Sequence, residues 1–502
     1  MYSLGYDIGS SFIKASILDL EKGTSVAHAF QPETEMPISA RRPGWAEQDP
    51  EVWWTALKNV TRELISRHSL DTSRIKCVGI TYQMHGLVLV DSSFNVLRPA
   101  IIWCDSRAVE IGQQAFMAIG KKRCLESFLN SPGNFTASKL FWVKENEPEV
   151  FKRVFKFLLP GDYIAMKLTG NLNTTVSGLT EGIFWNFKEN ALASELLDFY
   201  GIDQELIPAV VPTFGVQGEI TPEIAKELTI PAGIPICYRA GDQPNNALSL
   251  NVLNPGEAAA NAGTSGVVFG VSDRVRYDPK SRVNLFAHVN HSADQPRLGI
   301  LLCINGVGIL YSWLKKYMAA GVSYKDMDKS AAGIPAGSNE LMIFPFGNGA
   351  ERMLENRNIG CRILGLDFNR HADSHIFRAA QEGIAFAFRY GMDIMKEMGV
   401  ETKIIRAGMA NMFLSPIFNV ILAGVTGSEI ELYDTDGAQG AARGAAIGSG
   451  IFKSFSEAFA YLKLKKRIRP DSAHRGLYED IYERWKNHLD NFLIDLFAVK
   501  EK

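Results

Sequence analysis

The sequence lacks the cysteine spacings that build metal sites and redox centres. Its 502 residues contain six cysteines, and the two nearest in sequence, Cys104 and Cys124, stand 20 positions apart. No C-x-x-C motif is therefore possible, and no H-E-x-x-H motif supports a metal site at the histidine pairs 288–291 and 371–375. Several cysteines lie in apolar runs, which predicts small core residues in a reducing compartment.

An excess of positive charge is also absent. Fifty-three Lys and Arg stand against 55 Asp and Glu, a net charge of −2, which gives no electrostatic support for general nucleic-acid binding. The apolar run Gly299–Leu310 is interrupted by Asn305 and is shorter than the ~20 residues that a membrane helix needs. The first residues resemble no signal peptide. We therefore expect a cytoplasmic protein that binds neither nucleic acid nor membranes.

Two common nucleotide-binding motifs are missing. No G-x-x-x-x-G-K-[S/T] occurs, which excludes a P-loop, and no G-x-G-x-x-G follows a strand, which disfavours a dinucleotide site. The apolar fraction of 46 % and the charged fraction of 22 % are ordinary for a globular protein. At ~100–200 residues per domain, the length suffices for two to four domains.

Strands and helices alternate along the first part of the chain. Short apolar segments bounded by turns predict strands at residues 2–8, 12–19, 75–81, 87–91 and 100–103. Apolar residues at helical spacing, behind Asp49 and Pro50, predict a helix over residues 52–68. This alternation predicts an α/β architecture.

A comparable unit returns in the second half of the chain. Residues 257–262 and 267–271 predict two strands joined by Gly263–Gly266, as Gly9–Ser11 joins the first two. We therefore expect two related domains, residues 1–250 and 251–502, with the connection at Asn251–Gly256. An amphipathic helix predicted at about 474–497 could pack on its own domain or on a second copy, which would make the protein a homodimer.

Two further patterns predict packing and not chemistry. Gly440, Gly444 and Gly448 recur every four residues, which suits close packing of a helix. The run Lys463–Arg469 holds five basic residues in seven, which is more typical of a solvated edge strand than of a nucleic-acid patch.

The two glycine- and hydroxyl-rich turns are candidate phosphate sites. Glycine lets the backbone approach a ligand, and exposed N–H groups and hydroxyls suit phosphate oxygens. Asp7, at the end of the strand before the first turn, could hold a hydrated Mg²⁺, and Lys14 follows the turn. Taken alone, the first turn could equally be a capped hairpin.

Asp242 is the candidate catalytic base. It follows an apolar stretch that ends in Gly241, and an acid at the carboxyl end of a strand faces the crevice of an α/β sheet. A carboxylate there can accept a hydroxyl proton during phosphoryl transfer. The alternative is an acid that only stabilises an Asx-turn.

A polyol site is predicted where residues 83–86 follow the strand at 75–81. Gln83, Met84 and His85, with Trp103 and Asp105, supply the amide, imidazole, indole and carboxylate groups that bind polyols. The alternative for His85 is a structural histidine.

In this order, these residues resemble the FGGY carbohydrate kinases, and within them the xylulokinases, from Asp7 to at least Gly450. The resemblance rests on several motifs in family order. They are the loop at 7–14, W-A-E-Q-D-P at 45–50 with Trp53 and Trp54, Q-M-H-G at 83–86, K-L-F-W at 139–142, L-P-G-D-Y at 159–163, L-T-G at 168–170, Gly241-Asp242, G-T-S-G at 263–266 and Glu382-Gly383.

The resemblance implies two actin-like, ribonuclease-H-like domains with the active site in the cleft between them. It further implies ATP-dependent phosphorylation of a ketose, first of all D-xylulose to D-xylulose 5-phosphate, with Asp242 as base and Asp7 orienting hydrated Mg²⁺. The implied sugar contacts are Gln83, Met84, His85, Trp103, Asp105 and Gln243. The implied nucleotide contacts are Gly9, Ser10, Ser11, Lys14, Gly263, Thr264, Ser265, Gly308, Gly408 and Asn411.

Three places depart from the family pattern. Gln243 stands where many xylulokinases carry Asn, Met409 stands in a loop that is usually glycine-rich, and the G-A-E-R at 349–352 lacks the proline that usually follows. Ribulose, gluconate or a seven-carbon ketose such as sedoheptulose remain open as substrates. A non-catalytic sugar sensor and an actin-like ATPase with a protein partner are the alternatives from other classes.

Overall fold

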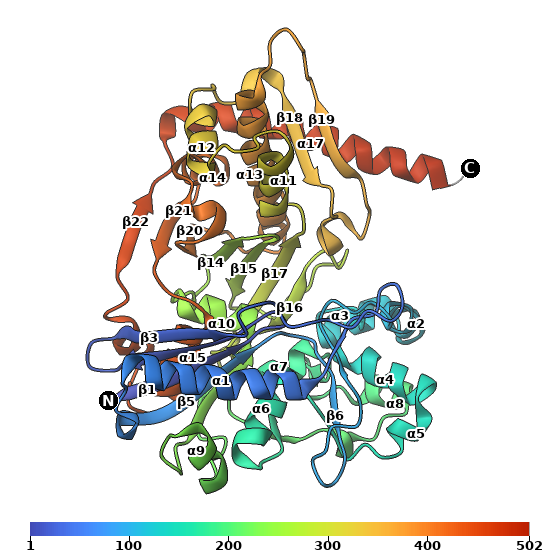
Figure 1. Ribbon diagram of the computed structural model, residues 1–502. Coiled ribbons are helices and arrows are strands. Elements are labelled where there is room, and N and C mark those ends of the chain that lie inside the picture. Colours follow the sequence, from blue (N-terminus) through green and yellow to red (C-terminus); the bar gives the residue numbers. More distant parts are fainter. Residues whose placement is uncertain (501–502) are drawn as a thin grey trace.

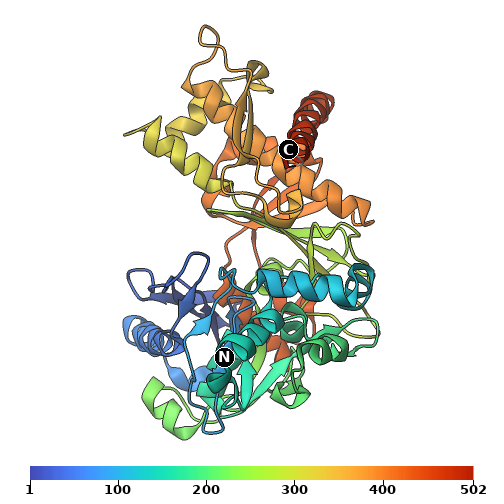
Figure 2. The same ribbon diagram turned by 90° about the vertical axis from the view of Figure 1, so that its right-hand side faces the viewer.

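The computed structural model describes residues 1–500, which form two lobes, one above the other (Figures 1 and 2). The lower lobe is built on a five-stranded sheet in the order β13-β5-β1-β2-β3. Its strands are β1 (Tyr2–Ile8), β2 (Ile13–Asp19), β3 (Thr24–Gln31), β5 (Ile75–Tyr82) and β13 (Ile236–Gly241). β1, β2 and β3 are antiparallel, whereas β1, β5 and β13 are parallel.

The upper lobe repeats this arrangement. Its seven-stranded sheet has the order β16-β17-β15-β14-β20-β21-β22. These strands are β14 (Glu257–Ala262), β15 (Gly266–Ser272), β16 (Asn284–Ala287), β17 (Leu298–Ile304), β20 (Ile404–Gly408), β21 (Glu429–Tyr433) and β22 (Leu464–Ile468). β14 pairs antiparallel with β15 and parallel with β20, as β1 pairs with β2 and β5. The prediction of two related α/β halves is therefore confirmed.

The helices surround the two sheets (Figure 1). In chain order they are α1 (Pro50–His68), α2 (Val109–Ile119), α3 (Lys121–Phe128), α4 (Thr136–Asn146), α5 (Pro148–Phe151), α6 (Pro160–Thr169), α7 (Val176–Glu181), α8 (Ser194–Tyr200), α9 (Pro222–Leu228), α10 (Asp242–Ser249), α11 (Gly308–Tyr317), α12 (Tyr324–Ala332), α13 (Asp373–Glu397), α14 (Pro416–Thr426), α15 (Gly437–Gly448), α16 (Phe455–Phe459) and α17 (Ser472–Lys500). No helix within residues 1–500 is both long and apolar enough to cross a bilayer.

The short strands pair among themselves outside the two main sheets. The pairs are β4 (Glu47–Gln48) with β7 (Ala100–Ile101), β6 (Val88–Val90) with β8 (Lys156–Leu158), β9 (Asn173–Thr175) with β12 (Ala209–Val211), β10 (Trp185–Asn186) with β11 (Ala191–Leu192), and β18 (Met342–Phe346) with β19 (Gly360–Leu364). The strands predicted at 87–91 and 100–103 are thus present but shorter. β22 is the predicted edge strand, and its residues Leu464–Arg467 are exposed.

The helix α15 comes from the second half of the chain but packs on the lower sheet (Figure 1). Two glycines of the repeat allow this approach: a Cβ at Gly444 would lie 2.6 Å from Tyr238, and one at Gly448 would lie 1.9 Å from the carbonyl of Cys237. The third, Gly440, packs against α10, where a Cβ would lie 2.7 Å from Ser249. The strands contribute Gly5 and Gly79 to the same contact. The predicted packing role of this glycine repeat is confirmed.

The long helix α17 packs against the upper lobe with the apolar face that its sequence predicts. Tyr482, Trp485 and Leu489 are fully buried, and the indole Nε1 of Trp485 donates to the carbonyl of Ile343 at 3.0 Å. The helix therefore packs on its own domain over this part. The homodimer stays a prediction, and residues 501–502 of the predicted C-terminal domain lie outside the described residues.

Candidate active site

The two candidate catalytic acids lie at the same edge of the lower sheet. Asp7 pairs in register with Thr81 of β5, and Thr81 pairs with Ala240 of β13. Gly241 ends β13, and Asp242 is the first residue of α10. Asp242 therefore sits at a strand-to-helix junction, and the parallel strands bring it beside Asp7 across one intervening strand.

Both carboxyl groups hold their protons more tightly than an exposed acid does. Burial, and secondarily the negative charge of Asp7, raises the pKa of Asp242 to about 7, against hydrogen bonds from the backbone and side chain of Gln243. Burial raises the pKa of Asp7 to about 6; Lys14, whose Nζ lies 4.0 Å away, opposes this, and Asp436 adds to it. A base with a pKa near 7 is suited to accept a proton at neutral pH.

The predicted sugar loop follows β5 and touches the residue before Asp242. A Cβ on Gly241 would lie 2.6 Å from the Cγ of Met84, so only glycine fits there. Gln83 is buried, and neither its amide nitrogen nor its amide oxygen has a partner within the described residues. A buried amide without partners is costly, which is consistent with a substrate supplying them.

His85 is held rigidly in a neutral state. It adopts a positive φ of 61°, and its Nδ1 lies 2.9 Å from the carbonyl oxygen of Glu181. Its ring packs against Phe135 and Phe286, with centroids 4.8 and 5.3 Å away. Burial, and then the charge of Lys139, lowers its pKa to about 3, so the imidazole serves as a neutral hydrogen-bonding group.

Two buried ionisable side chains that contact the backbone of His85, Lys139 and Glu181, were not predicted as site residues. The ammonium of Lys139 donates to the carbonyls of His85 and Ile102, both at 2.9 Å, and burial lowers its pKa to about 7. Glu181 accepts from the backbone N–H of His85 at 3.3 Å, and burial raises its pKa well above the usual range. The only sequence signal for Glu181 is an isolated acid in the apolar run 179–184.

The W-A-E-Q-D-P stretch supports the first phosphate turn. The side-chain amide of Gln48 donates to the carbonyl of Ser10 at 2.7 Å, and its oxygen accepts from Trp53 Nε1 at 3.0 Å. Asp49 caps α1, and Pro50 occupies its first turn. Trp103 lies beside the same turn, with its Nε1 3.3 Å from Ser10 Oγ, and half of its surface is exposed.

Asp105 differs from the predicted sugar contact. Its side chain has no exposed surface, one oxygen accepts from the backbone N–H of Ala46 at 2.6 Å, and both oxygens bind Arg107. The guanidinium of Arg107 in turn lies 3.8 Å from the ring centroid of Trp45. In this structure the Asp105 carboxylate is fully engaged, and we assign it to holding the loop that carries Trp103.

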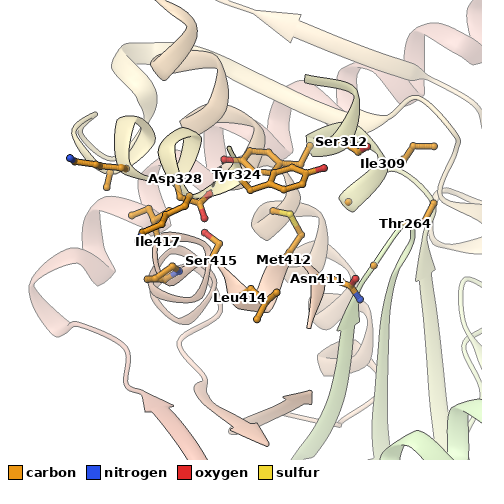
Figure 3. Close-up of a pocket in the computed structure, with 18 residues that line it drawn as sticks. Thr264, Ile309, Ser312, Tyr324, Asp328, Asn411, Met412, Leu414, Ser415 and Ile417 are labelled. Atoms are coloured by element: carbon orange, nitrogen blue, oxygen red, sulfur yellow. Dashed lines mark hydrogen bonds between the residues drawn. The ribbon is translucent and has the colours of Figure 1, made fainter. Parts of the chain in front are cut away.

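A cavity of about 870 Å³ lies in the upper lobe (Figure 3). Four predicted nucleotide-binding residues line it: Gly263, Thr264, Gly308 and Asn411. The N-terminus of α11 abuts the turn, since Gly308 N–H donates to the carbonyl of Gly263 at 2.8 Å. The N–H of Ile309 likewise donates to the carbonyl of Thr264 at 3.2 Å, so the start of α11 holds the turn in place, and the turn itself borders the cavity as a candidate phosphate contact.

The far part of this cavity combines apolar side chains with polar ones such as Asp328 and Ser415. Tyr324, Met412, Leu414 and Ile417 line it in Figure 3, and they come from α12, the turn before α14 and α14 itself. A slot lined in part by apolar side chains, next to a phosphate turn, suits a flat heterocyclic base. Met409, which stands in a loop that is usually glycine-rich, is exposed and does not line the cavity. Its bulky side chain therefore does not block the slot.

The chain between β21 and α15 connects the two sets of residues. A Cβ on Gly408 would lie 3.6 Å from the carbonyl of Thr435, and a Cβ on Gly437 would lie 2.7 Å from Asp7 Oδ2. The same short segment therefore touches the end of β20 in the upper lobe and the acid at the end of β1 in the lower lobe. Asp7 therefore lies at the junction of the two lobes, and the segment that contacts it also contacts Gly408.

The acids at this junction fit a hydrated divalent cation. Asp7 keeps 17 % of its side-chain surface exposed, and its raised pKa reflects nearby negative charge from Asp436 as well as burial. Among residues 1–500, no group of three or more His, Cys, Asp or Glu side chains could enclose a metal. Mg²⁺ typically keeps several waters and binds one or two carboxylates plus substrate phosphates, which matches this sparse acidic site.

Two family models together match most of the chain, up to residue 451. The N-terminal domain model of the FGGY family of carbohydrate kinases matches residues 2–249, and the C-terminal domain model matches residues 258–451. The xylulose kinase of Escherichia coli K12 is 30 % identical over 490 residues, covering 96 % of this chain and 97 % of that protein. The xylulose kinase of Bacillus subtilis is 28 % identical over 502 residues, covering 97 % and 96 %.

Solved structures share the fold over nearly their full length. A xyloylose kinase from Brucella ovis has a TM-score of 0.89 and 26 % identity, with 99 % of this chain and 100 % of that chain covered. A gluconate kinase from Lactobacillus acidophilus has a TM-score of 0.88 at 23 % identity, with 98 % of both chains covered. The expected two-domain fold is confirmed. Because kinases named for different sugars share it, the fold alone does not identify the sugar.

Proposed function

The chain belongs to the FGGY family of carbohydrate kinases, and we propose that it phosphorylates D-xylulose to D-xylulose 5-phosphate with ATP. The observation that carries the proposal is the position of Asp242, which begins α10 at the sheet edge that also holds Asp7 and follows Gly241, the residue that contacts Met84 of the sugar loop. Relatives named xylulose kinase align over nearly the whole chain, which supports the choice of sugar.

In the proposed reaction, Asp242 accepts the proton of the terminal O5 hydroxyl. The hydroxyl oxygen bonds to the γ-phosphorus of ATP as the bond from that phosphorus to the β,γ-bridging oxygen breaks, and ADP leaves. The amide of Gln243 holds the carboxylate in place by hydrogen bonding to it. General-base help of this kind contributes about 10²–10⁴-fold to the rate.

The sugar would lie along the loop after β5. The unpaired amide of Gln83 and the neutral imidazole of His85 can donate and accept hydrogen bonds from hydroxyl groups. Trp103, half exposed beside the first turn, offers an apolar face to the carbon chain. Lys139 and Glu181 hold this loop from behind and do not reach solvent.

The triphosphate would lie between the turns at 9–11 and 263–266, with the base in the slot of the upper lobe. Ser265 belongs to the second turn, and Gly408 lies beside the segment that reaches Asp7. Asp7 would hold hydrated Mg²⁺, which supplies charge neutralisation at the transferring phosphoryl group. Exclusion of water from the cleft favours transfer to the sugar over hydrolysis of ATP.

We expect the sugar panel to separate the candidate substrates. The purified protein is incubated with Mg·ATP and D-xylulose, D-ribulose, D-gluconate or sedoheptulose, and ADP release is followed by a coupled assay. The expected result is the highest kcat/KM with D-xylulose. A higher value for another sugar would reassign the substrate, and no sugar-stimulated ADP release would favour a sensor.

The pH profile follows from the raised pKa of Asp242. A general base must be ionised, so activity is lost as pH falls through the pKa of about 7. We expect kcat/KM for the sugar to fall about tenfold per pH unit below that point and to level off above it. The measurement is kcat/KM from pH 5 to 9 at constant free Mg²⁺, with thermal melts to show that the protein stays folded. A flat profile down to pH 5 would contradict the assigned base.

A further inference from the structure

Arg352 is a half-buried cation that pairs with no acid. It lies in the short 3₁₀ turn Glu351–Leu354 of the upper lobe, and its guanidinium forms no ion pair within the described part of the chain. Its Nη1 donates a hydrogen bond to a neutral group, Ser281 Oγ, at 3.2 Å. By contrast, the buried Arg107 and Arg239 lie within 3 Å of carboxylates, and the buried Arg443 donates to two backbone carbonyls.

Besides Ser281 of its own lobe, Arg352 contacts residues of the opposite lobe. Its guanidinium carbon lies 5.1 Å from the ring centroid of Phe135, and a Cβ on Gly133 would lie 2.7 Å from its Nη2. Phe135 in turn packs against His85. The positive charge of Arg352 also contributes to the lowered pKa of His85. A side chain from the second half of the chain thus packs on Phe135, the residue that supports His85 in the first half.

A row of contacts leads from Asp242 to Arg352. Gly241 touches Met84, His85 follows Met84 in the loop, and Phe135 packs against both His85 and the guanidinium. Arg352 therefore lies at the end of this row that is remote from Asp242. In a ketose phosphorylated at its terminal hydroxyl, the carbonyl is at the other end of the carbon chain. A ketose whose terminal hydroxyl meets Asp242 and whose carbon chain follows this row would turn its carbonyl toward Arg352.

We infer that Arg352 is a specificity-determining residue that donates a hydrogen bond to the carbonyl oxygen of an open-chain ketose across the cleft. The inference rests on the proposed function, because that function puts the reacting hydroxyl at Asp242. A guanidinium has five N–H donors in a fixed plane and no acceptor, so it favours a carbonyl oxygen over a hydroxyl that must also donate. Since Arg352 comes from the other lobe, the ketose is held from both sides.

The test compares a ketose with the alditol that lacks the carbonyl. For wild type, Arg352→Gln and Arg352→Lys, kcat/KM is measured with D-xylulose and with xylitol. We expect Arg352→Gln to lower kcat/KM for D-xylulose about 10- to 100-fold, because a hydrogen bond from a charged donor is removed. The same substitution should change kcat/KM for xylitol little, because xylitol has no carbonyl. Arg352→Lys should recover part of the loss, and KM for ATP should stay unchanged. Arg370→Gln, which breaks an exposed pair with Glu340 in the same lobe, is the matched control.

Two results would overturn the inference: an unchanged kcat/KM with D-xylulose, or an equal loss with both substrates, which indicates a structural role through Phe135. The proposed function fails separately, if wild type does not phosphorylate D-xylulose. In that case kcat/KM of wild type and the Arg352 variants is measured with a ketose of the panel that is phosphorylated and with the corresponding alditol. If no ketose turns over, the assignment of Arg352 is overturned as well.

Discussion

Asp242→Asn is expected to lower kcat for sugar phosphorylation by about 10²–10⁴-fold while nucleotide affinity stays nearly unchanged. Asparagine keeps the size of the side chain and can still accept the hydrogen bond from Gln243. It cannot take up a proton, so the attacking hydroxyl keeps its proton for longer along the reaction path. The cavity that we propose for the nucleotide lies in the other lobe and does not include Asp242.

The measurement combines steady-state ADP release with calorimetric binding of an ATP analogue. Asp71→Asn is the matched control, because Asp71 is an exposed cap of a 3₁₀ turn and asparagine caps equally well. It should behave as wild type in both assays. A kcat within a few-fold of wild type for Asp242→Asn would show that another group accepts the proton, and a large loss of nucleotide affinity would show that the change disturbs both lobes.

The acids and turns of the site could be predicted because each is a local pattern. Asp7 and Asp242 end or follow an apolar segment beside glycine, and such segments fold as strands whose ends form one edge of a sheet. The two hairpin turns were visible as equivalent because strand, small residues and strand occur in both halves. For these residues, local sequence and sheet geometry suffice to predict where they lie in the fold.

The residues that join distant segments could not be predicted in the same way. Nothing around Arg352 in sequence indicates that it packs on Phe135, more than 200 positions earlier. The docking of β16 is similar: its edge is bound by the side chain of Asn130, whose amide donates to the carbonyl of Leu285 at 2.6 Å, and by Thr180, which accepts from Ala287 N–H at 3.0 Å. Such contacts depend on how the two lobes meet.

Asp105 shows how a local pattern can mislead. A tryptophan, a small residue and an acid after a strand resemble a polyol site, and Trp103 does lie beside the first turn. The acid, however, turns inward to Arg107, because that guanidinium is stacked on Trp45 and needs a carboxylate partner. The partner lies two residues away, but its buried position depends on tryptophans elsewhere in the chain.

Gly79→Ala is expected to destabilise the protein by about 3 kcal/mol, because overpacking a buried contact costs about 1–3 kcal/mol and this one involves rigid backbone. An added Cβ would lie 2.0 Å from the carbonyl oxygen of Ala441 and 3.1 Å from the Cβ of Ala445. Neither the β5 strand nor α15 can move locally, since Gly5 in the neighbouring strand lies equally close to Ala438. The helix as a whole must shift away from the sheet.

The same substitution should also lower activity, because the start of α15 touches the site. A Cβ on Gly437 would already lie 2.7 Å from Asp7 Oδ2, so a displaced helix moves the backbone that Asp7 packs against. We expect a melting temperature several degrees below wild type by calorimetry and a reduced kcat at 25 °C, where the variant is still folded. Gly476→Ala in α17 is the control: a Cβ there meets nothing within 4 Å, and alanine favours a helix by about 0.5–1 kcal/mol. If Gly79→Ala has the same melting temperature as wild type, α15 is free to move relative to the sheet. The stability of the lower lobe then does not depend on this contact.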